Sequence, residues 1–283
     1  MFYKRLIPVL LHKHGKLVRS KQFKVHQVIG DPVLQTNRYK KWDLDELIYL
    51  DISADWCDES RQYNQESFIN VIQNIAKHCF VPLSVGGGIR NLDDIRKLLH
   101  AGADRVIINS QAIYNTDFIK SAAETFGSQA IIISVDAVLD GNDYEVLTSG
   151  GRQKSGMKLH EWVSRICQLG AGEIFLNNVD RDGLAIGYDI EMVKCAVNAS
   201  TIPVITCGGA GEFRDFIDPL VAGGATAIAA ANIFNFTETS YYYAKMALVD
   251  AGLNVRPVKI VDSDSISQSK SGISVDNSIW DRL

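Results

Sequence analysis

Short apolar runs alternate with longer amphipathic stretches along most of the chain. Several of the runs are almost continuously apolar, such as VIIN at 106–109 and IIISV at 131–135. Runs without polar alternation are typical of parallel strands that are buried on both faces. Eight strands are predicted in this way, near residues 5–11, 46–52, 81–85, 105–109, 130–136, 173–177, 203–206 and 227–231.

The stretches between the predicted strands have the period of an amphipathic helix. In 68–80, the apolar side chains of Phe68, Ile72 and Ile75 fall on one stripe. Residues 92–102 and 159–172 show the same period and reach a glycine, which is a common helix stop. Repeated β–α units in a chain of this length predict the α/β class and a (β/α)8 TIM barrel. A doubly wound open sheet is the alternative.

An internal repeat favours the barrel. Residues 85–110 (VGGGIRNLDDIRKLLHAGADRVIINS) resemble residues 207–232 (CGGAGEFRDFIDPLVAGGATAIAAAN) without a gap. Each copy contains a strand, a glycine turn, a helix, a Gly-Ala pair and a second strand that ends in a small polar residue. The repeat predicts two half-barrels related by a pseudo-twofold axis, and a chance likeness between two βα units is the alternative.

Two segments do not follow the barrel pattern. Residues 140–156 predict a β-excursion with a glycine-rich loop, at the rim where barrel enzymes place their active sites. The chain after the barrel is rich in Ser and Asp and has weak periodicity, which predicts a surface extension. We therefore predict one barrel domain over 1–256 and a polar C-terminal extension over 257–283.

Composition excludes several classes of protein. The chain has 46% hydrophobic and 22% charged residues and a formal net charge of −4, which is typical of a soluble globular protein and unlike a nucleic-acid binder. The sequence contains no apolar run near the roughly 20 residues of a membrane span and does not begin like a secretory signal. Its cysteines are scattered, and its histidines lack metal-ligand spacing. We predict a cytoplasmic protein without metal or cofactor.

Glycine turns after two corresponding strands are candidate phosphate sites. Gly86, Gly87 and Gly88 follow one strand, and Gly208 and Gly209 follow the other. Bare backbone allows N–H groups to approach an anion, and a following helix adds positive potential. Asn109, Ser110 and Asn232 follow the next strands of the two copies and would complete each site. Two copies predict a ligand with two phosphates, and ordinary tight turns are the alternative.

Carboxylates at strand ends are candidate catalytic groups. Asp51 and Asp136 each end an apolar strand, and Asp182 lies in the segment NNVDRDG. The carboxyl ends of barrel strands are where such enzymes place catalytic residues. Helix capping is the alternative role for Asp136, and turn formation is the alternative for Asp182.

Charged residues also stand at the starts of four of the predicted strands. We predict that these residues lie on every second strand around the barrel. They are Arg5, Glu46, Arg105 and Glu173. Two positive and two negative charges predict a closed ring of ion pairs across the bottom of the barrel. The residues alone indicate a role in stability.

Together, these motifs resemble HisF, the cyclase subunit of imidazole glycerol phosphate synthase, over about residues 1–256. The resemblance is carried by KRLIPVL, IGDP, DELIYLDIS, VPLSVGGGIR, AGADRVIINS, FGSQAIIISVDA, LGAGEIFLNNVDRDG, GYDIEM, IPVITCGGAG and NIFNF. It implies a duplicated (β/α)8 barrel and a HisH-like glutaminase as the partner. It also implies that ammonia from this partner passes through the barrel to the rim.

The resemblance assigns roles to most of the candidate residues. It implies phosphate binding by Gly87, Gly88, Asn109, Ser110, Gly208, Gly209, Ala231 and Asn232. It implies catalysis by Asp136 and substrate-side positions for Asp51 and Asp182. It also implies that the charged ring is the ammonia gate, with Arg105 at a position that is usually Lys.

One catalytic position departs from the family pattern. Where the family reads CLDVKDG, this chain reads VLLHKHG, so Leu11 replaces the first catalytic aspartate. Losing one member of an acid–base pair typically removes a factor of about 10²–10⁴ in rate. His12 is adjacent, but neighbours on a strand point to opposite faces. The family's Lys and Thr positions nearby are Arg19 and Leu184.

The pattern of VLLHK, then FK, then IGDP resembles HisF paralogues associated with acetamidino modification of surface-polysaccharide sugars. The resemblance implies a HisH-like glutaminase and a separate sugar amidotransferase as partners, and a phosphorylated ligand. Our leading hypothesis is therefore a HisF-type subunit that supplies ammonia for amidine formation, as in lipopolysaccharide O-antigen synthesis. A genuine cyclase of histidine biosynthesis and a non-catalytic scaffold that activates a glutaminase are the alternatives.

Overall fold

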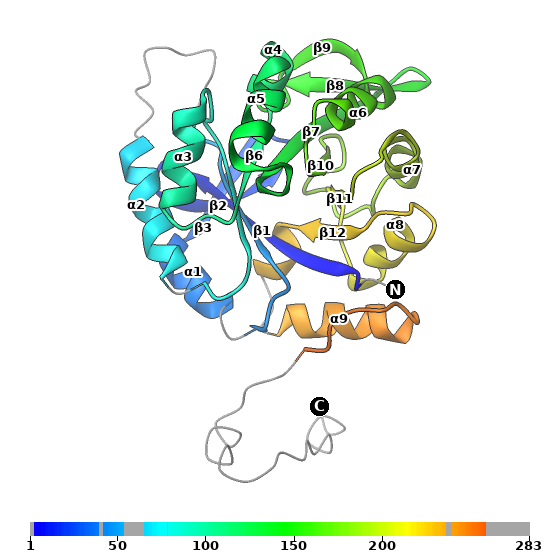
Figure 1. Ribbon diagram of the computed structural model, residues 1–283. Coiled ribbons are helices and arrows are strands. Elements are labelled where there is room, and N and C mark those ends of the chain that lie inside the picture. Colours follow the sequence, from blue (N-terminus) through cyan, green and yellow to red (C-terminus); the bar gives the residue numbers. More distant parts are fainter. Residues whose placement is uncertain (1–2, 40–41, 54–64, 78, 236–238, 259–283) are drawn as a thin grey trace, which may run out of the picture.

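Eight parallel strands form a closed barrel (Figure 1) in a computed structural model that describes residues 3–39, 42–53, 65–77, 79–235 and 239–258. In order around the barrel, the strands are β1 (Arg5–Lys13), β4 (Leu47–Asp51), β5 (Leu83–Gly86), β6 (Arg105–Ile108), β7 (Ile131–Asp140), β10 (Glu173–Asn178), β11 (Val204–Cys207) and β12 (Ala227–Ala230). The ring closes because β12 pairs with β1 and β10 pairs with β7, all in parallel. The (β/α)8 barrel is thus confirmed, and all eight predicted strands are present. The open sheet is excluded.

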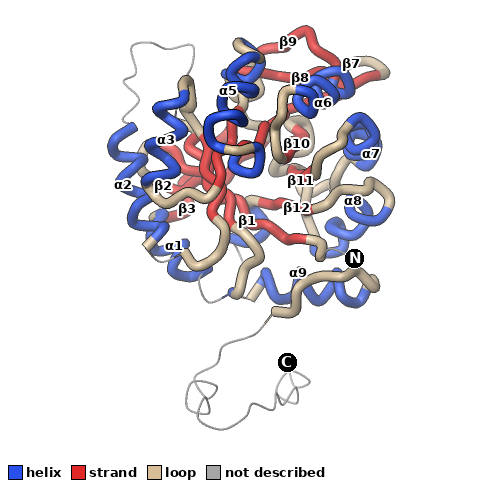
Figure 2. The backbone as a smooth tube through the Cα atoms, in the orientation of Figure 1, coloured by secondary structure: helices blue, strands red, loops and turns tan. Residues whose placement is uncertain are grey.

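Helices surround the barrel on its outside, as Figure 2 shows. They are α1 (Pro32–Tyr39), α2 (Gln65–Ala76), α3 (Leu92–His100), α4 (Ser110–Tyr114), α5 (Asp117–Phe126), α6 (Leu159–Gln168), α7 (Ile190–Ala199), α8 (Ile217–Val221) and α9 (Ser240–Asp250). The start of α3 follows from its sequence, because the side chain of Asn91 accepts a hydrogen bond of 3.0 Å from the N–H of Asp94. The three helices predicted by periodicity are confirmed as α2, α3 and α6.

Alternation along the strands divides the apolar residues into two layers. In β1, Ile7, Val9 and Leu11 belong to a buried cluster inside the barrel. Leu6 and Leu10 belong to a second, larger cluster between the strands and the helices. Because side chains on a strand point alternately to its two faces, the position of each residue in β1 fixes which layer it enters.

Two hairpin-like excursions extend from the carboxyl ends of barrel strands. The strands β8 (Asp143–Thr148) and β9 (Gln153–Lys158) continue from β7, as the sequence predicts. The strands β2 (Lys16–Lys21) and β3 (Val25–Gly30) continue from β1 and were not predicted. Both excursions therefore lie at the rim of the barrel.

The repeated segments form corresponding units in the two halves of the barrel. The first copy contains β5, α3 and β6, and the second contains β11, a 3-10 turn η3 (Phe213–Phe216), the short α8 and β12. Gly87 and Gly209 both have φ near +112°, with values of 112° and 113°. The helix of the second copy is shorter than the repeat predicts.

The limits of the predicted domain and extension stay predictions, because most of 257–283 lies outside the described residues. Among the helices that the structure describes, none is long and apolar enough to cross a membrane. Within the same residues there is no group of three His, Cys, Asp or Glu side chains that could hold a metal ion.

Candidate active site

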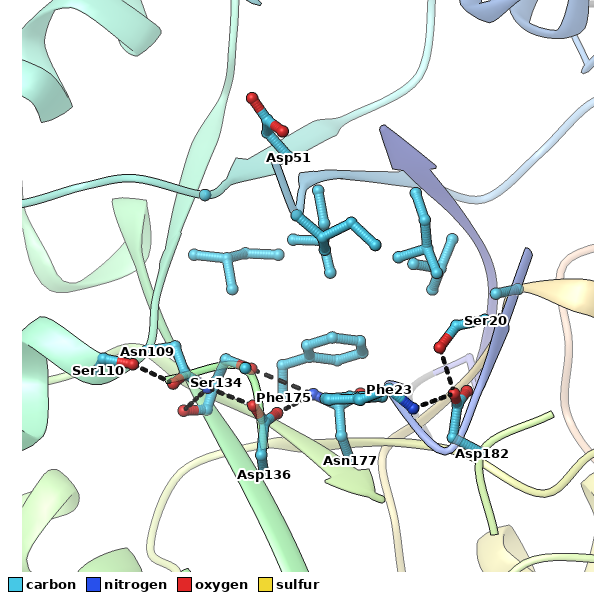
Figure 3. Close-up of a pocket in the computed structure, with 18 of the residues that line it drawn as sticks. Ser20, Phe23, Asp51, Asn109, Ser110, Ser134, Asp136, Phe175, Asn177 and Asp182 are labelled. Atoms are coloured by element: carbon cyan, nitrogen blue, oxygen red, sulfur yellow. Dashed lines mark hydrogen bonds between the residues drawn. The ribbon is translucent and has the colours of Figure 1, made fainter. Parts of the chain in front are cut away.

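A pocket opens at the carboxyl ends of the barrel strands, and its two sides differ in chemistry (Figure 3). The apolar residues that line it include Val9, Leu11, Leu50, Ile52, Ile89 and Ile107. The polar side includes Ser20, Asn109, Ser134, Asp136, Asn177 and Asp182. The pocket lies where (β/α)8-barrel enzymes carry their chemistry, which makes it the candidate active site.

Asp136 is the central carboxylate of the polar side. It lies within the long strand β7 and is 5% exposed. Its Oδ2 accepts a hydrogen bond of 3.0 Å from Nδ2 of Asn109, and its Oδ1 accepts one of 2.9 Å from Nδ2 of Asn177. Burial raises the pKa of Asp136 to about 6, although the two amide donors oppose this effect and the charge of Asp182 adds to it. A carboxyl group that titrates near neutrality is suited to both accept and donate a proton.

Asp182 links the loop after β10 to the β2–β3 excursion. Its Oδ2 accepts a hydrogen bond of 2.6 Å from Oγ of Ser20 and one of 3.4 Å from the N–H of Phe23. Burial raises its pKa, while these hydrogen bonds lower it. Gly183 is required beside it, because a Cβ there would lie 2.2 Å from the carbonyl oxygen of Ser20 and φ is +67°. Asp182 therefore both lines the pocket and holds the excursion against the rim.

Asp51 also lines the pocket, but its carboxylate is turned to the side (Figure 3). Its Oδ1 accepts a hydrogen bond of 2.7 Å from the N–H of Ser53 and lies 3.4 Å from Nδ1 of His12. Its backbone carbonyl supports the first glycine turn, because a Cβ on Gly87 would lie 2.2 Å from that oxygen. The structure thus places Asp51 as a support of the pocket edge.

Position 11 presents an apolar group to the pocket. Leu11 belongs to the interior cluster and is 9% exposed. His12 points to the other face of β1, where the centroid of its ring lies 5.4 Å from the ring centroid of Phe68 and 6.0 Å from that of Tyr49. His14 is exposed and contacts Ser53 through its backbone N–H. Neither histidine occupies the place of the missing aspartate.

The structure brings the residues of the first candidate phosphate site to one pocket, while phosphate binding there stays a prediction. Gly87, Gly88, Asn109 and Ser110 all line the pocket, and we call these four residues the first cradle. Both glycines have positive φ, at 112° and 67°. Such a conformation favours glycine and turns backbone N–H groups away from their usual partners. Ser110 is buried at the start of α4.

The second candidate site is less exposed to the pocket. Of Gly208, Gly209, Ala231 and Asn232, the second cradle, only Ala231 lines the pocket. A Cβ on Gly209 would lie 2.1 Å from the carbonyl oxygen of Gly187, so the turn is packed against the loop after β10. Asn232 donates a hydrogen bond of 2.8 Å to the carbonyl oxygen of Ser20, while its own Oδ1 is buried without a hydrogen-bond partner among the described residues. The two halves of the barrel are therefore not equivalent at the rim.

The four charged residues at the strand starts form a closed ring. Nη1 of Arg5 lies 2.7 Å from Oε1 of Glu46, and Nη1 of Arg105 lies 2.7 Å from Oε2 of Glu173. Arg5 also pairs with Glu173, and Arg105 with Glu46. Burial alone would lower the pKa of Arg5, but its two glutamate partners raise it. The placement on alternate strands is wrong in one respect, because β1 and β4 are neighbours.

An apolar interior separates the ring from the pocket. It includes Ile7, Ile48, Ile132, Phe175, Ile205, Ala227 and Ala229, all of which are fully buried. On β1, the inward order from the ring upward is Arg5, Ile7, Val9 and Leu11, which brings the ring to one end of this interior and the pocket to the other.

Two groups of pocket residues were not predicted from the sequence. Asn177 was not singled out, although it follows Phe175 at the spacing that places both side chains inside the barrel. Ser20, Phe23 and His26 were missed because the β2–β3 excursion was not predicted. Its sequence has no apolar run that would have indicated a buried strand.

The chain is a closed (β/α)8 barrel with a repeated half. It has a pocket at one rim and an ion-pair ring at the other end, which places it in the class of (β/α)8-barrel proteins. Residues 5–240 match the family model described as "Histidine biosynthesis protein". The chain is 42% identical over 258 residues to "Imidazole glycerol phosphate synthase subunit HisF" of Caulobacter vibrioides (strain NA1000 / CB15N), a match that covers 90% of this chain and 97% of that protein. The same subunit of strain ATCC 19089 / CIP 103742 / CB 15 gives the same values. The chain therefore belongs to the histidine biosynthesis protein family and is HisF-like.

Proposed function

We propose that this chain is a HisF-type synthase subunit that receives ammonia from a HisH-like glutaminase and supplies it for amidine formation on a surface-polysaccharide sugar. The observation that carries the proposal is the contrast between the two ends of the barrel. The ring of Arg5, Glu46, Arg105 and Glu173 is closed, whereas Leu11 stands where the family has its first catalytic aspartate.

In this proposal the ring admits ammonia and the apolar interior conducts it. Ammonia is neutral when it is released from the amide of glutamine, so an apolar lining favours it over ammonium. The interior side chains from Ile7 to Ala229 would keep water and competing cations out of this path. The glutaminase would dock at the ring end, because the ammonia has to enter there.

At the rim, Asp136 is the group placed to exchange a proton with the incoming nitrogen or with the ligand. Its amide partners, Asn109 and Asn177, fix the orientation of both carboxylate oxygens. The first and second cradles would hold phosphates of the ligand. Replacement of a carboxamide oxygen by nitrogen releases water, and we assign that step to the separate sugar amidotransferase.

The second candidate function is a genuine cyclase subunit of histidine biosynthesis. It is favoured by the 42% identity to the HisF subunits of Caulobacter vibrioides and by Asp136, which matches the second catalytic aspartate. In that case a single carboxyl group would have to serve as both acid and base.

A ring-closure assay with the histidine-pathway substrate distinguishes the two. Ammonium salt is supplied directly, so that the result does not depend on the partner glutaminase. We expect turnover at least about 100-fold below that of a HisF with both aspartates, the lower range for the loss of one acid–base group. Turnover equal to that of such a HisF would contradict the amidine proposal. A chain that accelerates its glutaminase but transfers no ammonia would instead be the scaffold.

A further inference from the structure

His12 and Asp51 form a buried pair at the carboxyl ends of β1 and β4. The two residues are register partners on these neighbouring parallel strands. Nδ1 of His12 lies 3.4 Å from Oδ1 of Asp51, and the two side chains are 5% and 2% exposed. An imidazole and a carboxylate therefore meet where almost no water reaches them.

Packing alone does not explain a histidine at position 12. Its ring is stacked against Phe68 of α2 and against Tyr49, and neither ring nitrogen forms a hydrogen bond within the described part of the chain. Burying such a polar ring costs free energy that an apolar side chain would not. The family pattern CLDVKDG has valine at this position, so the histidine is a departure of this chain. The contact with Asp51 is the interaction that valine could not make.

Asp51 is the residue on which the first cradle rests. A Cβ on Gly87 would lie 2.2 Å from the carbonyl oxygen of Asp51 and 2.9 Å from its Cβ. Asp51 also lines the same pocket as all four residues of the first cradle. Its carboxylate is thus a negative charge beside a candidate phosphate site. If this carboxylate turned into the pocket, it would repel a bound phosphate.

Two contacts hold the carboxylate of Asp51 to the side. The N–H of Ser53 donates a hydrogen bond of 2.7 Å to Oδ1, and His12 lies against the same oxygen. Figure 3 shows the carboxylate pointing away from Asp136 and Asp182. The amide of Ser53 is a neutral donor, whereas an imidazole can also carry a positive charge. Without it, the buried carboxylate would gain free energy by turning to the water of the pocket.

We propose that His12 is a positioning residue that holds the carboxylate of Asp51 out of the pocket and so favours phosphate binding at the first cradle. The inference rests on the proposed function at one point, which is phosphate binding at that cradle. It adds a residue to which the family resemblance assigns no role. Leu11 and His12 then act in the same direction, because one removes a carboxylate from the pocket and the other turns a second one away.

Calorimetric titration of the full chain with inorganic phosphate tests the proposal. His12→Leu keeps an apolar side chain against Phe68, and we expect it to weaken phosphate binding by about fivefold or more, since a charge beside the site loses its partner. Asp51→Asn removes that charge and can still accept the hydrogen bond from Ser53. In the double variant we therefore expect the affinity to return to within about twofold of the wild type.

His14→Asn is the matched control. His14 is an exposed histidine two residues further along, and it contacts Ser53 through its backbone N–H. Its φ is +48°, a conformation that asparagine tolerates. This variant should bind phosphate as the wild type does. Ser110→Ala should bind it more weakly, because the first cradle then lacks a hydroxyl donor.

Phosphate binding that ignores His12→Leu would overturn the proposal. A loss of affinity that Asp51→Asn does not reverse would also overturn it, since a merely structural role of His12 predicts no rescue by removal of the neighbouring charge. Urea denaturation verifies that each variant is folded. If His12→Leu does not fold, His12→Gln takes its place, and Asp51→Asn should rescue its smaller loss in the same way.

Failure of this inference is distinguishable from failure of the proposed function, because phosphate binding needs no ammonia. The expected rescue, combined with no transfer of ammonia from the glutaminase, would refute the proposed function and leave the role of His12 in place. Absence of phosphate binding by the wild type, or binding that Ser110→Ala does not weaken, would refute the role of His12, while ammonia transfer is measured separately.

Discussion

Nδ2 of Asn177 donates a hydrogen bond of 2.9 Å to Oδ1 of Asp136 on the neighbouring strand β7. Amide donors stabilise the ionised carboxylate, yet burial outweighs them and the pKa rises to about 6. The carboxyl group is thus held by two amide donors, as an ionised carboxylate would be, although its pKa lies close to neutral pH. This combination suits Asp136 to the proton exchange that the proposed function assigns to it.

The raised pKa of Asp136 predicts how stability depends on pH. A carboxyl group whose pKa is higher in the fold than in the unfolded chain adds stability below the unfolded value of about 4, and this is lost as the pH rises through about 6. Asp136→Asn does not titrate. Relative to the wild type, its free energy of unfolding should therefore rise between pH 4 and pH 8, by on the order of 3 kcal/mol.

Urea denaturation at several pH values across this range measures the difference. Asp117→Asn, on an exposed position of α5, corrects for the loss of one negative charge. A pH-independent difference between Asp136→Asn and the wild type would show that burial does not perturb this carboxyl group.

Restoring an acid at position 11 should restore part of the ring-closing activity. Leu11→Asp supplies a second carboxyl group to the pocket, and we expect ring closure to increase by about 10²-fold, the lower range for one acid–base group. Leu11→Asn has the same shape without the proton and serves as the control. Both variants will lose stability, because Leu11 belongs to the apolar interior cluster.

The initial rate of ring closure with ammonium salt, normalised to the folded fraction, provides the measurement. If Leu11→Asn gains as much activity as Leu11→Asp, polarity rather than proton transfer limits the wild type, and the account of position 11 is wrong.

The ion-pair ring should tolerate a change of cation better than its removal. Arg105→Met leaves Arg5 to compensate two buried glutamates, so we expect a loss of about 3 kcal/mol in unfolding free energy. Arg105→Lys retains the charge and should lose less. The ring's proposed gating role adds a second effect: with the glutaminase bound, Arg105→Met should release more free ammonia per glutamine hydrolysed.

Chemical denaturation and an ammonia assay of the complex check the two effects separately. A stability loss without any change in ammonia leakage would limit the ring to a structural role, as the charged residues alone indicate.

The barrel was predictable because its strands are apolar runs, and the ring was predictable because its charges stand at strand starts. The contact between Ser20 and Asp182 was not predictable, since it joins residues far apart in the chain through an excursion whose strands contain no long apolar run. The sideways orientation of Asp51 follows from its sharing a face of β4 with Tyr49, which lies in the outer layer. The alternation of side chains along β4 can be read from the sequence. It does not show which set of side chains faces the barrel interior.

Transfer of nitrogen from amide-¹⁵N glutamine tests the central claim most directly. The chain, its glutaminase and a sugar amidotransferase are supplied together with an acetamido sugar acceptor and the histidine-pathway substrate. We predict ¹⁵N in the amidine group of the sugar and almost none in an imidazole ring, and Arg105→Met should reduce the sugar label. Label that enters the imidazole and not the sugar would contradict the account.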